Sequence, residues 1–307
     1  MRAATQRRRP YCFRYNQSCW PEPYFFRLNA VLTNRYYNGK PDAMDLQLKN
    51  RHALVIGSTA GIGFAIARGL AAEGTQVTIT GRTQANVDAA LARLRSSVPG
   101  ATADGVAADC AAVAGAEKVF ARVAEADILV NNLGIYERKP FFEIPDADWL
   151  RLFEVNVLSG VRFARRYGQG MAKRAWGRII FVSSESALNV PREMIHYGMT
   201  KTAQLTIARG LAMELAGTGV TVNSLLPGPT RTENTERLRA ERAKAANMTV
   251  AELEKDFFAS FRPTSLLKRF TSAEEVANLA VYLCSPLASA TNGAAMRADG
   301  GVVNQIM

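Results

Sequence analysis

Three residues in the second half of the chain have side chains and spacings suited to moving a proton to or from an oxygen atom. Tyr197 and Lys201 are four positions apart, and Ser184 precedes Tyr197 by thirteen residues. Residues i and i+4 share one face of a helix, so the phenol and the ammonium can reach the same ligand. A nearby cation lowers the pKa of a phenol from its ordinary value of about 10, and a serine hydroxyl can hold an oxygen. The three residues predict proton transfer at a carbonyl or alcohol, coupled to hydride transfer at carbon.

Two neighbouring residues compete for these roles. Ser183 is the alternative to Ser184, and the spacing to Tyr197 favours Ser184. His196 adjoins Tyr197, but adjacent helix residues point about 100° apart, so we expect a packing or substrate-rim residue and not a base. Serine hydrolysis is not indicated, because the chain has no G-x-S-x-G motif and His196 has no evident acidic partner in the sequence.

A glycine-rich segment indicates where a dinucleotide phosphate binds. An apolar strand is predicted to end in Gly57-Ser58-Thr59-Ala60-Gly61-Ile62-Gly63, which an amphipathic helix follows. Glycine allows the tight turn, the close approach of a pyrophosphate and close helix packing, while free amides at the helix start bind phosphate. The alternative is a plain strand-to-helix turn, which the strand-turn-helix context disfavours.

The G-x-x-x-G-x-G spacing and the further motifs, in this order, resemble the short-chain dehydrogenase/reductase family from about Leu46 to Val303. The resemblance implies an α/β fold: a single-domain, Rossmann-type, doubly wound parallel sheet with helices on both faces. Two residues depart from the family pattern. Ile56 stands where the family usually has Thr, which affects local packing, and Leu133 stands where it usually has Ala, beside the adenine ribose.

The resemblance also implies roles for the catalytic residues. Tyr197 is the proton donor or acceptor, Lys201 activates it and holds the nicotinamide ribose, and Ser184 clamps the substrate oxygen. Asn156, in the stretch FEVNVLSG, resembles the family residue that positions a water linking Lys201 to solvent. A structural Asn with satisfied hydrogen bonds is the alternative for Asn156.

The end of the second predicted strand bears on the choice of cofactor. An acid near this point binds a free ribose 2′-hydroxyl, whereas a 2′-phosphate requires a cation and no acid. Gly81 stands where the acid would be, and Arg82 with Ser58 and Thr83 forms a predicted 2′-phosphate site. NADP(H) is therefore preferred over NAD(H), which stays open because Arg82 could also be a solvated surface residue.

The resemblance implies cofactor contacts at the other strand ends as well. Asp109 would contact the adenine, and Thr230 and Thr232 would hold the nicotinamide carboxamide. Asn131 could instead be a turn residue, and Pro-Gly-Pro at 227–229 could simply end a strand. The predicted cofactor-binding residues are Gly57, Ser58, Gly61, Ile62, Gly63, Arg82, Thr83, Asp109, Cys110, Asn131, Leu133, Gly134, Tyr197, Lys201, Pro227, Gly228, Thr230 and Thr232.

Alternation of strands and helices after Met44 predicts the parallel sheet that these motifs need. The predicted strands are 53–57, 76–80, 104–108, 127–131, 178–183, 220–225 and 294–298. The predicted helices are 61–73, 83–97, 112–125, 146–175, 193–216 and 273–284. We therefore assign one domain to residues 44–307, preceded by an atypical basic and aromatic extension, 1–43. That extension is a mis-assigned start, an Arg-rich targeting peptide or an accessory arm.

Composition narrows the classes of function. The formal net charge is +11, but residues 1–43 carry +6 of it, which leaves +5 for the domain and disfavours nucleic-acid binding there. Apolar runs of about five residues are too short to cross a membrane, which takes roughly 20 residues. The four cysteines and two histidines lack metal-ligand spacing, so no metal site is predicted. Reduced thiols favour a cytoplasmic location.

Residues 233–265 form a charged helical run that we interpret as a substrate lid. Its apolar members would face an apolar substrate or a neighbouring subunit: Leu253, Phe257, Phe258 and Phe261. Weaker pocket candidates are Tyr136, Leu188, Asn189 and Met194. The family resemblance implies a homodimer or homotetramer paired through the helices at 146–175 and 193–216.

Three hypotheses follow for function. The first is an NADP(H)-dependent oxidoreductase acting on a carbonyl or alcohol, of the ketone or 3-oxoacyl reductase type. The second is a catalytically silent NAD(P)-binding sensor or scaffold, which the intact Ser184, Tyr197 and Lys201 disfavour. The third is a basic nucleic-acid-binding protein whose binding depends on residues 1–43. The sequence leaves acyl thioesters, steroids, sugars and simple ketones open as substrates.

Overall fold

The computed structural model describes residues 44–306, and the predictions for the extension 1–43 lie outside this range. The chain divides into two units, Met1–Asp45 and Leu46–Met307, of which the second contains the elements described below. Its centre is a parallel sheet of seven strands in the order β3-β2-β1-β4-β5-β6-β9. The strands are β1 (His52–Ile56), β2 (Gln76–Gly81), β3 (Ala103–Ala107), β4 (Ile128–Asn131), β5 (Gly177–Val182), β6 (Val220–Pro227) and β9 (Ala295–Ala298).

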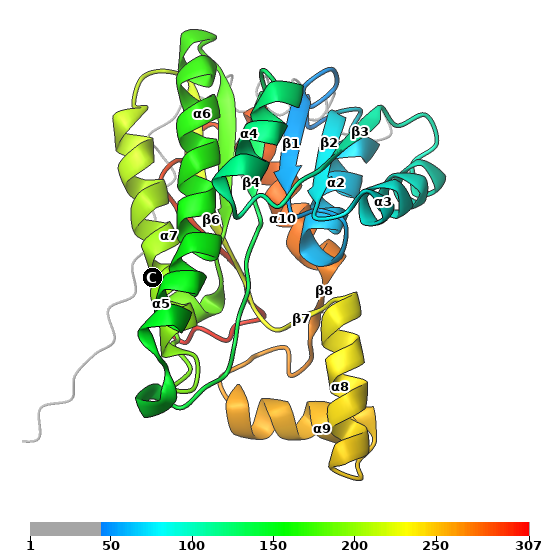
Figure 1. Cartoon of the computed structure of the whole chain (residues 1–307), viewed down its shortest axis with the longest axis vertical. Coiled ribbons are helices and arrows are strands. Elements are labelled where there is room, and N and C mark those ends of the chain that lie inside the picture. Colours follow the sequence, from blue (N-terminus) through cyan, green and yellow to red (C-terminus); the bar gives the residue numbers. More distant parts are fainter. Residues whose placement is uncertain (1–43, 307) are drawn as a thin grey trace, which may run out of the picture. The chain divides into compact units, whose positions relative to one another are not determined.

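Both faces of this sheet are apolar, as β1 illustrates. Alternate side chains of a strand point to opposite faces, so Ala53 and Val55 belong to one core and Leu54 and Ile56 to the other. Helices cover both cores (Figure 1), which confirms the predicted doubly wound fold. On the first face lie α2 (Gly61–Ala72), α3 (Gln84–Ser97) and α10 (Ala273–Cys284); on the second lie α4 (Val113–Arg122), α6 (Ser159–Lys173) and α7 (Ile195–Glu214).

The predicted helix 146–175 is interrupted in the structure. It consists of α5 (Asp146–Phe153), one π-helical segment η2 (Glu154–Leu158) and then α6. A π-helical turn holds an extra residue and changes the direction in which side chains point, and such turns are frequent at functional sites. Asn156 lies within this turn and is 1% exposed. The other predicted helices and strands are present, with ends shifted by a few residues.

The predicted lid region is helical as expected. It contains α8 (Glu233–Ala245), α9 (Val250–Asp256) and the π-helical η4 (Phe257–Phe261). A small parallel pair, β7 (Thr230–Arg231) and β8 (Thr271–Ser272), closes the base of this region where the chain leaves and rejoins the main sheet. Short 3-10 turns complete the fold at η1 (Phe141–Glu143), η3 (Glu185–Ala187) and η5 (Pro286–Ala288).

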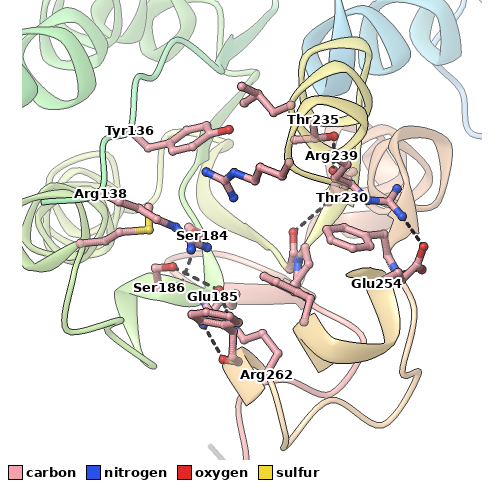
Figure 2. A pocket seen from close by; sticks show the side chains of 18 of the residues that line it. Tyr136, Arg138, Ser184, Glu185, Ser186, Thr230, Thr235, Arg239, Glu254 and Arg262 are labelled. Atoms are coloured by element: carbon pink, nitrogen blue, oxygen red, sulfur yellow. Dashed lines mark hydrogen bonds and ion pairs between the residues drawn. The ribbon is translucent and has the colours of Figure 1, made fainter. Parts of the chain in front are cut away.

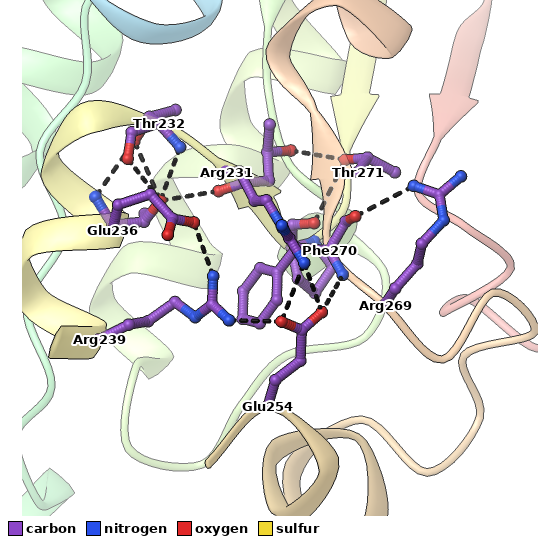
Figure 3. A network of polar contacts seen from close by, with 11 residues as sticks. Arg231, Thr232, Glu236, Arg239, Glu254, Arg269, Phe270 and Thr271 are labelled. Atoms are coloured by element: carbon purple, nitrogen blue, oxygen red, sulfur yellow. Dashed lines mark hydrogen bonds and ion pairs between the residues drawn. The ribbon is translucent and has the colours of Figure 1, made fainter. Parts of the chain in front are cut away.

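Glu254 holds the two lid helices to the base (Figure 3). Its carboxylate accepts hydrogen bonds from Arg231 at 3.0 and 3.1 Å and from the Phe270 amide at 3.2 Å, and it forms an ion pair with Arg239 of α8. Burial would raise the pKa of Glu254, but the Phe270 and Arg231 hydrogen bonds and the charges of both arginines outweigh burial and lower it. These contacts therefore fix α8 and α9 against the strand pair β7–β8.

Within residues 44–306, no helix has both the length and the apolar character that crossing a membrane requires.

Candidate active site

The candidate site lies at the carboxyl ends of the parallel strands. β1 and β4 are neighbours in the sheet, so the order of strand addition reverses between them. In open parallel sheets, ligands bind at such a reversal, outside the carboxyl ends. The segments that follow β1, β4, β5 and β6 meet along this edge, and they carry Gly57, Asn132, Ser184 and Gly228.

The turn after β1 has the backbone geometry that phosphate binding requires. Gly57 and Gly61 have φ angles of +68° and +58°, in the left-handed region that favours glycine. A Cβ atom at Gly63 would lie 2.4 Å from Asn132 Nδ2 and 2.5 Å from Gly57 O, so only glycine fits. Asn132 Nδ2 donates to Gly57 O at 2.7 Å and joins the turn to the end of β4. Sequence reasoning omitted Asn132, although it lies inside the Asn-Asn-Leu-Gly motif.

Two members of the predicted 2′-phosphate site use their hydroxyls elsewhere. Ser58 is fully buried, and its Oγ donates to Val55 O at 2.6 Å and accepts from Thr80 N at 3.0 Å. Strands β1 and β2 therefore hold the Ser58 hydroxyl, so the predicted contact with the cofactor would come from the backbone of Ser58. Thr83 Oγ1 accepts from Asn86 N at 3.3 Å and caps α3.

The third member, Arg82, keeps the predicted arrangement. It is exposed directly after β2, and none of the contacts found among residues 44–306 engages its guanidinium. Gly81 before it is closely packed, since a Cβ atom there would lie 2.4 Å from the Thr59 methyl. An acid at position 81 would require the neighbouring side chain to move, so this edge presents a cation without a carboxylate.

Glu233, the first residue of α8, contacts the phosphate turn. Its Oε2 accepts a hydrogen bond from Gly61 N at 2.9 Å, and its Oε1 pairs with Arg93 of α3 at 3.1 Å. Burial would raise the pKa of Glu233, but hydrogen bonds from its own amide, Arg93 and Gly61 outweigh burial and lower it. The lid and the turn are therefore directly connected, a contact that sequence reasoning missed because 172 positions separate the two residues.

Asp109 and Cys110 lie at the end of β3. Asp109 is exposed and its Oδ1 accepts from Ala111 N at 3.2 Å, which leaves the other carboxylate oxygen for a ligand. Cys110 is 3% exposed, and burial raises the pKa of its thiol to about 11. Its side chain is therefore a packing group, and only its backbone could meet a cofactor.

The segment after β4 carries three of the predicted cofactor residues. Asn131 is 4% exposed, and neither polar atom of its side chain has a partner within the described range. Leu133 packs on the phosphate turn, 3.4 Å from a Cβ position at Gly57. A Cβ at Gly134 would lie 3.3 Å from Lys201 Nζ, so the absence of a side chain leaves room around the ammonium.

Ser184 and Ser183 have clearly different surroundings. Ser184 is 9% exposed, and its Oγ accepts from Ser186 N at 3.1 Å while remaining in contact with the cavities described below. Ser183 lines only the first cavity, and its Oγ donates to the Lys201 carbonyl at 2.8 Å and holds the backbone of α7. This geometry favours Ser184 as the residue that meets the substrate oxygen.

Tyr197 and Lys201 share one face of α7, as their spacing predicts. Lys201 Nζ lies 5.6 Å from the Tyr197 ring centroid and donates to Val182 O at 2.9 Å. Burial raises the pKa of Tyr197 to about 12, although a hydrogen bond with Ser184 acts in the opposite direction. Burial lowers the pKa of Lys201 to about 7. Burial thus favours the neutral form of both groups, and the activation of Tyr197 by Lys201 stays a prediction.

Asn156 is satisfied by protein groups. Its Oδ1 accepts from Ile135 N at 2.8 Å, and its Nδ2 donates to Ile135 O at 2.9 Å and to Thr200 Oγ1 at 3.0 Å. Its carbonyl accepts from Gln204 Nε2 at 2.6 Å, and Gln204 Oε1 accepts from Lys201 Nζ at 3.2 Å. Gln204 thus bridges Asn156 and Lys201, and the predicted water that links Lys201 to solvent stays a prediction. The position of Gln204 three residues after Lys201, on the same helix face, was the signal available in the sequence.

Two cavities meet at the catalytic residues. One, of about 300 Å³, follows the strand ends. The other, of about 470 Å³, lies under the lid (Figure 2). Residues that line both are Tyr136, Ser184, Tyr197, Gly228, Thr230 and Thr235. Predicted cofactor residues that line the first are Ile62, Gly134, Lys201, Pro227, Gly228, Thr230 and Thr232. Ser184 and Tyr197 therefore stand where a ligand in one cavity can react with a ligand in the other.

The predicted threonines use their hydroxyls to shape the loop. Thr230 Oγ1 donates to Gly228 O at 2.9 Å and lies 3.0 Å from Thr271 Oγ1. Thr232 forms a capping box with Thr235 at the start of α8. Both residues line the first cavity, with their hydroxyls engaged in the protein.

Most of the predicted substrate-side residues line the second cavity. Tyr136, Met194, Leu253, Phe257 and Phe261 are among its walls. Phe258 is buried and packs edge-on against Phe270, with ring centroids 5.2 Å apart, while Leu188 and Asn189 lie outside the lining.

His196 is a packing residue, as predicted. It is fully buried, its ring lies 5.8 Å from that of Trp149, and neither ring nitrogen has a hydrogen-bond partner among the described residues. Burial lowers its pKa. Across residues 44–306, no three His, Cys, Asp or Glu side chains gather as a metal-ligand set.

Comparison with known proteins agrees with this geometry. The family model described as Enoyl-(Acyl carrier protein) reductase matches residues 56–303. The chain is 46% identical over 263 residues to Uncharacterized oxidoreductase YvaG of Bacillus subtilis, covering 86% of this chain and 100% of that protein. It is 32% identical to 3-oxoacyl-[acyl-carrier-protein] reductase FabG of Aquifex aeolicus, covering 84% of this chain and 100% of that protein.

The chain belongs to the short-chain dehydrogenase/reductase family. Among solved structures, L-sorbose reductase from Gluconobacter frateurii, complexed with NADPH and L-sorbose, is similar to it with a TM-score of 0.80 and 31% identity. That similarity covers 86% of this chain and 100% of the reductase. As a short-chain dehydrogenase/reductase, the chain is an NAD(P)-dependent oxidoreductase acting on CH–OH and C=O groups.

The residues present fit a dinucleotide cofactor. The first turn of α2 offers the amides of Ile62 and Gly63, while Gly61 N already bonds to Glu233, and the side chain of Asn131 has no hydrogen-bond partner among residues 44–306. Gly134 and Lys201 border the first cavity beside Tyr197, where a nicotinamide ribose would lie. Gln204, which bridges Asn156 and Lys201, is the feature of this short-chain dehydrogenase/reductase that the family resemblance did not predict.

Proposed function

We propose that this chain is an NADP(H)-dependent carbonyl reductase, acting on a ketone or a 3-oxoacyl compound. The observation that carries the proposal is the position of Ser184 and Tyr197 at the junction of the two cavities. The relatives support it, since one is named a 3-oxoacyl reductase and another is an L-sorbose reductase complexed with NADPH.

The chain's own residues supply the proton that the carbonyl oxygen takes up on reduction. When bound, the reduced nicotinamide supplies hydride to the carbonyl carbon. Ser184 Oγ–H holds the carbonyl oxygen beside Tyr197 and stabilises its developing negative charge. The Tyr197 O–H bond breaks as the alcohol O–H bond forms, which leaves a phenolate. A protonated Lys201 then stabilises that phenolate, and Gln204 and the Val182 carbonyl keep the Lys201 Nζ in place.

The pKa values of the free enzyme support reduction as the direction. Burial raises the pKa of Tyr197 to about 12, so the phenol is protonated at neutral pH and ready to donate. Oxidation of an alcohol would need the phenolate instead. We therefore expect faster turnover with NADPH and a ketone than with NADP⁺ and the alcohol at neutral pH.

Preference for the phosphorylated cofactor rests on Arg82. The guanidinium is exposed at the end of β2 with no acid at Gly81, which suits a 2′-phosphate. We expect Arg82→Ala to lower kcat/KM for NADPH by roughly tenfold to a hundredfold, the value of a charge-assisted hydrogen bond, and to change that for NADH little. Arg122→Ala, which removes an exposed arginine paired with Asp104, is the control. A wild-type preference for NADH would overturn the assignment.

The test of the reaction is a panel of ketones, 3-oxoacyl thioesters and ketoses, assayed with NADPH and, as alcohols, with NADP⁺. We expect wild-type turnover on at least one class and a loss of roughly 10²–10⁴-fold in Tyr197→Phe. Tyr282→Phe on α10 is the matched control, because Tyr282 lines neither of the two cavities. Tight NADPH binding without turnover on any class would favour the sensor or scaffold hypothesis.

We further propose that the enzyme acts in the cytoplasm as a homo-oligomer paired through α5, α6 and α7. Exposed apolar side chains on these helices support the pairing: Leu150 is 69% exposed and Met213 is 67% exposed. Light scattering coupled to size exclusion would measure the mass. A monomer at micromolar concentration would contradict the pairing.

A further inference from the structure

The second cavity, the one of about 470 Å³, is lined by more arginines than carboxylates. Four arginines line it, together with Glu185, Glu254 and Asp256. The four are Arg138, Arg239, Arg242 and Arg262. A cavity with a surplus of one sign of charge concentrates ligands of the opposite sign.

Two of these arginines are neutralised within the wall. Arg262 donates two hydrogen bonds to Glu185 Oε1, at 2.7 and 3.0 Å, and both side chains are nearly buried. Arg239 forms ion pairs with Glu236 and Glu254. Such buried pairs are structural, because each charge already has a partner.

The other two arginines have no such partner. Across residues 44–306, neither Arg138 nor Arg242 forms an ion pair or a hydrogen bond through its guanidinium, and Asp256 in the same wall bonds to Ser260. Arg138 instead lies over the Phe261 ring, 5.3 Å from its centroid. Burial lowers the pKa of Arg138, and the positive charges of Arg242 and Arg262 lower it further, while the negative charge of Glu193 raises it. The positive charge of Arg242 therefore acts on Arg138, and Glu193 offsets it in part without forming an ion pair with Arg138.

The two arginines come from different segments of the chain. Arg138 lies in the segment between β4 and α5, whereas Arg242 lies near the end of α8 in the lid. Figure 2 shows Tyr136 and Arg138 on one side and Thr230, Arg239 and Glu254 on the other, with Ser184 between them. A small ligand that reaches Ser184 and Tyr197 with its carbonyl can therefore extend its other end between the arginines.

We propose that Arg138 and Arg242 bind an anionic group of the substrate, a carboxylate or a phosphate, so that the enzyme reduces negatively charged oxo compounds. This inference rests on the proposed function and narrows its substrate class. The anion relieves the repulsion between the two guanidinium groups and gives each a charge-assisted hydrogen bond. The aromatic wall of Phe257 and Phe261 then covers the carbon chain between carbonyl and anion.

Matched substrate pairs test the proposal. Acetoacetate is compared with its methyl ester, and dihydroxyacetone phosphate with dihydroxyacetone, each with NADPH. We expect kcat/KM to be at least tenfold higher for one charged member than for its neutral partner, and to fall with added salt. The pair that shows the larger preference identifies carboxylate or phosphate. Equal kcat/KM within both pairs would overturn the proposal.

Substitutions of the two arginines test whether they cause the preference for charged substrates. We expect Arg138→Met and Arg242→Met each to lower kcat/KM for the preferred charged substrate by roughly tenfold to a hundredfold, while the neutral partner changes less than threefold. Arg237→Met removes an exposed α8 arginine that pairs with Glu241 outside the cavity, and it should leave both unchanged. Equal losses for charged and neutral substrates would show a structural role and contradict the proposal.

A binding measurement separates this proposal from the proposed reaction. Titration calorimetry of succinate and glycerol 3-phosphate, which are not ketones, measures anion binding without turnover. Binding of one anion by the wild type that weakens at least tenfold in the Arg138→Met/Arg242→Met double variant supports the site, even if no ketone is reduced. Absence of binding by both anions, or equal binding by the double variant, would overturn it.

Discussion

Replacing Lys201 by methionine should change stability in a pH-dependent way that follows from its burial. Lys201 is 4% exposed, and burial lowers its pKa from 10.5 to about 7. Between these two pH values the unfolded chain binds one more proton than the folded chain, so wild-type stability rises with pH by about 1.4 kcal/mol per unit. Below pH 7 the ammonium is charged in both states and its burial cost is fully present. Methionine has no such proton to lose.

The experiment compares the free energies of unfolding of Lys201→Met and wild type, and follows how the difference between them changes with pH. We expect the free energy of unfolding of Lys201→Met minus that of wild type to fall by about 3 kcal/mol between pH 6 and pH 9. Lost hydrogen bonds to Val182 and Gln204 affect the difference equally at every pH, so they cancel in its change. Urea unfolding at one protein concentration measures both proteins.

A second substitution controls for the loss of a surface charge. Lys173→Met removes an exposed lysine at the end of α6, and its stability difference should stay constant over the same pH range. A Lys201→Met difference that changes by less than about 1 kcal/mol from pH 6 to pH 9 would refute the role of burial.

Three further predictions concern catalysis. Ser184→Ala should lower kcat by roughly 10²–10³-fold, because it removes stabilisation of the oxyanion. Ser183→Ala should lower kcat by less than tenfold, since the Ser183 hydroxyl holds the Lys201 carbonyl. Steady-state assays that rank the two variants in reverse would contradict the assignment. Gln204→Glu places a carboxylate beside Lys201 and should raise the pKa of Lys201, which moves the pH profile of kcat toward alkaline pH. Gln204→Leu should not move the profile. Identical profiles for the two variants would argue against this contact. His196→Phe should keep kcat within about threefold of the wild-type value, because the His196 ring packs against Trp149 and has no hydrogen-bond partner among the described residues. A loss of about 10²-fold in the same assay would favour the general-base hypothesis instead.

Residue types at the strand ends made much of the site predictable. Alternating strands and helices required a parallel sheet, and the carboxyl ends of its strands meet at one edge. Gly57, Ser184 and Tyr197 therefore could be assigned to one site before their distances were known. The four-residue spacing of Tyr197 and Lys201 correctly predicted their shared helix face.

What could not be predicted depends on tertiary contacts. Spacing indicated that Lys201 lies near Tyr197, but not that burial raises the pKa of the phenol and lowers that of the ammonium. The Ser58 hydroxyl bonds within the sheet because Thr80, from the next strand, supplies an amide. The π-helical turn around Asn156 has no periodic pattern that distinguishes it from an α-helix, so the long helix was predicted as continuous.

Helix α8 extends from the phosphate turn to the second cavity. α8 begins with Glu233 on the phosphate turn and carries Arg242 into the substrate cavity, about 14 Å further along the helix axis. Because its backbone hydrogen bonds hold α8 as one element, we expect a shift at one end to move the other. Cofactor and substrate should therefore influence each other's affinity, and by the same factor in both directions. A contact between one carboxylate and one backbone amide would thus couple two ligand sites that are separate in the structure.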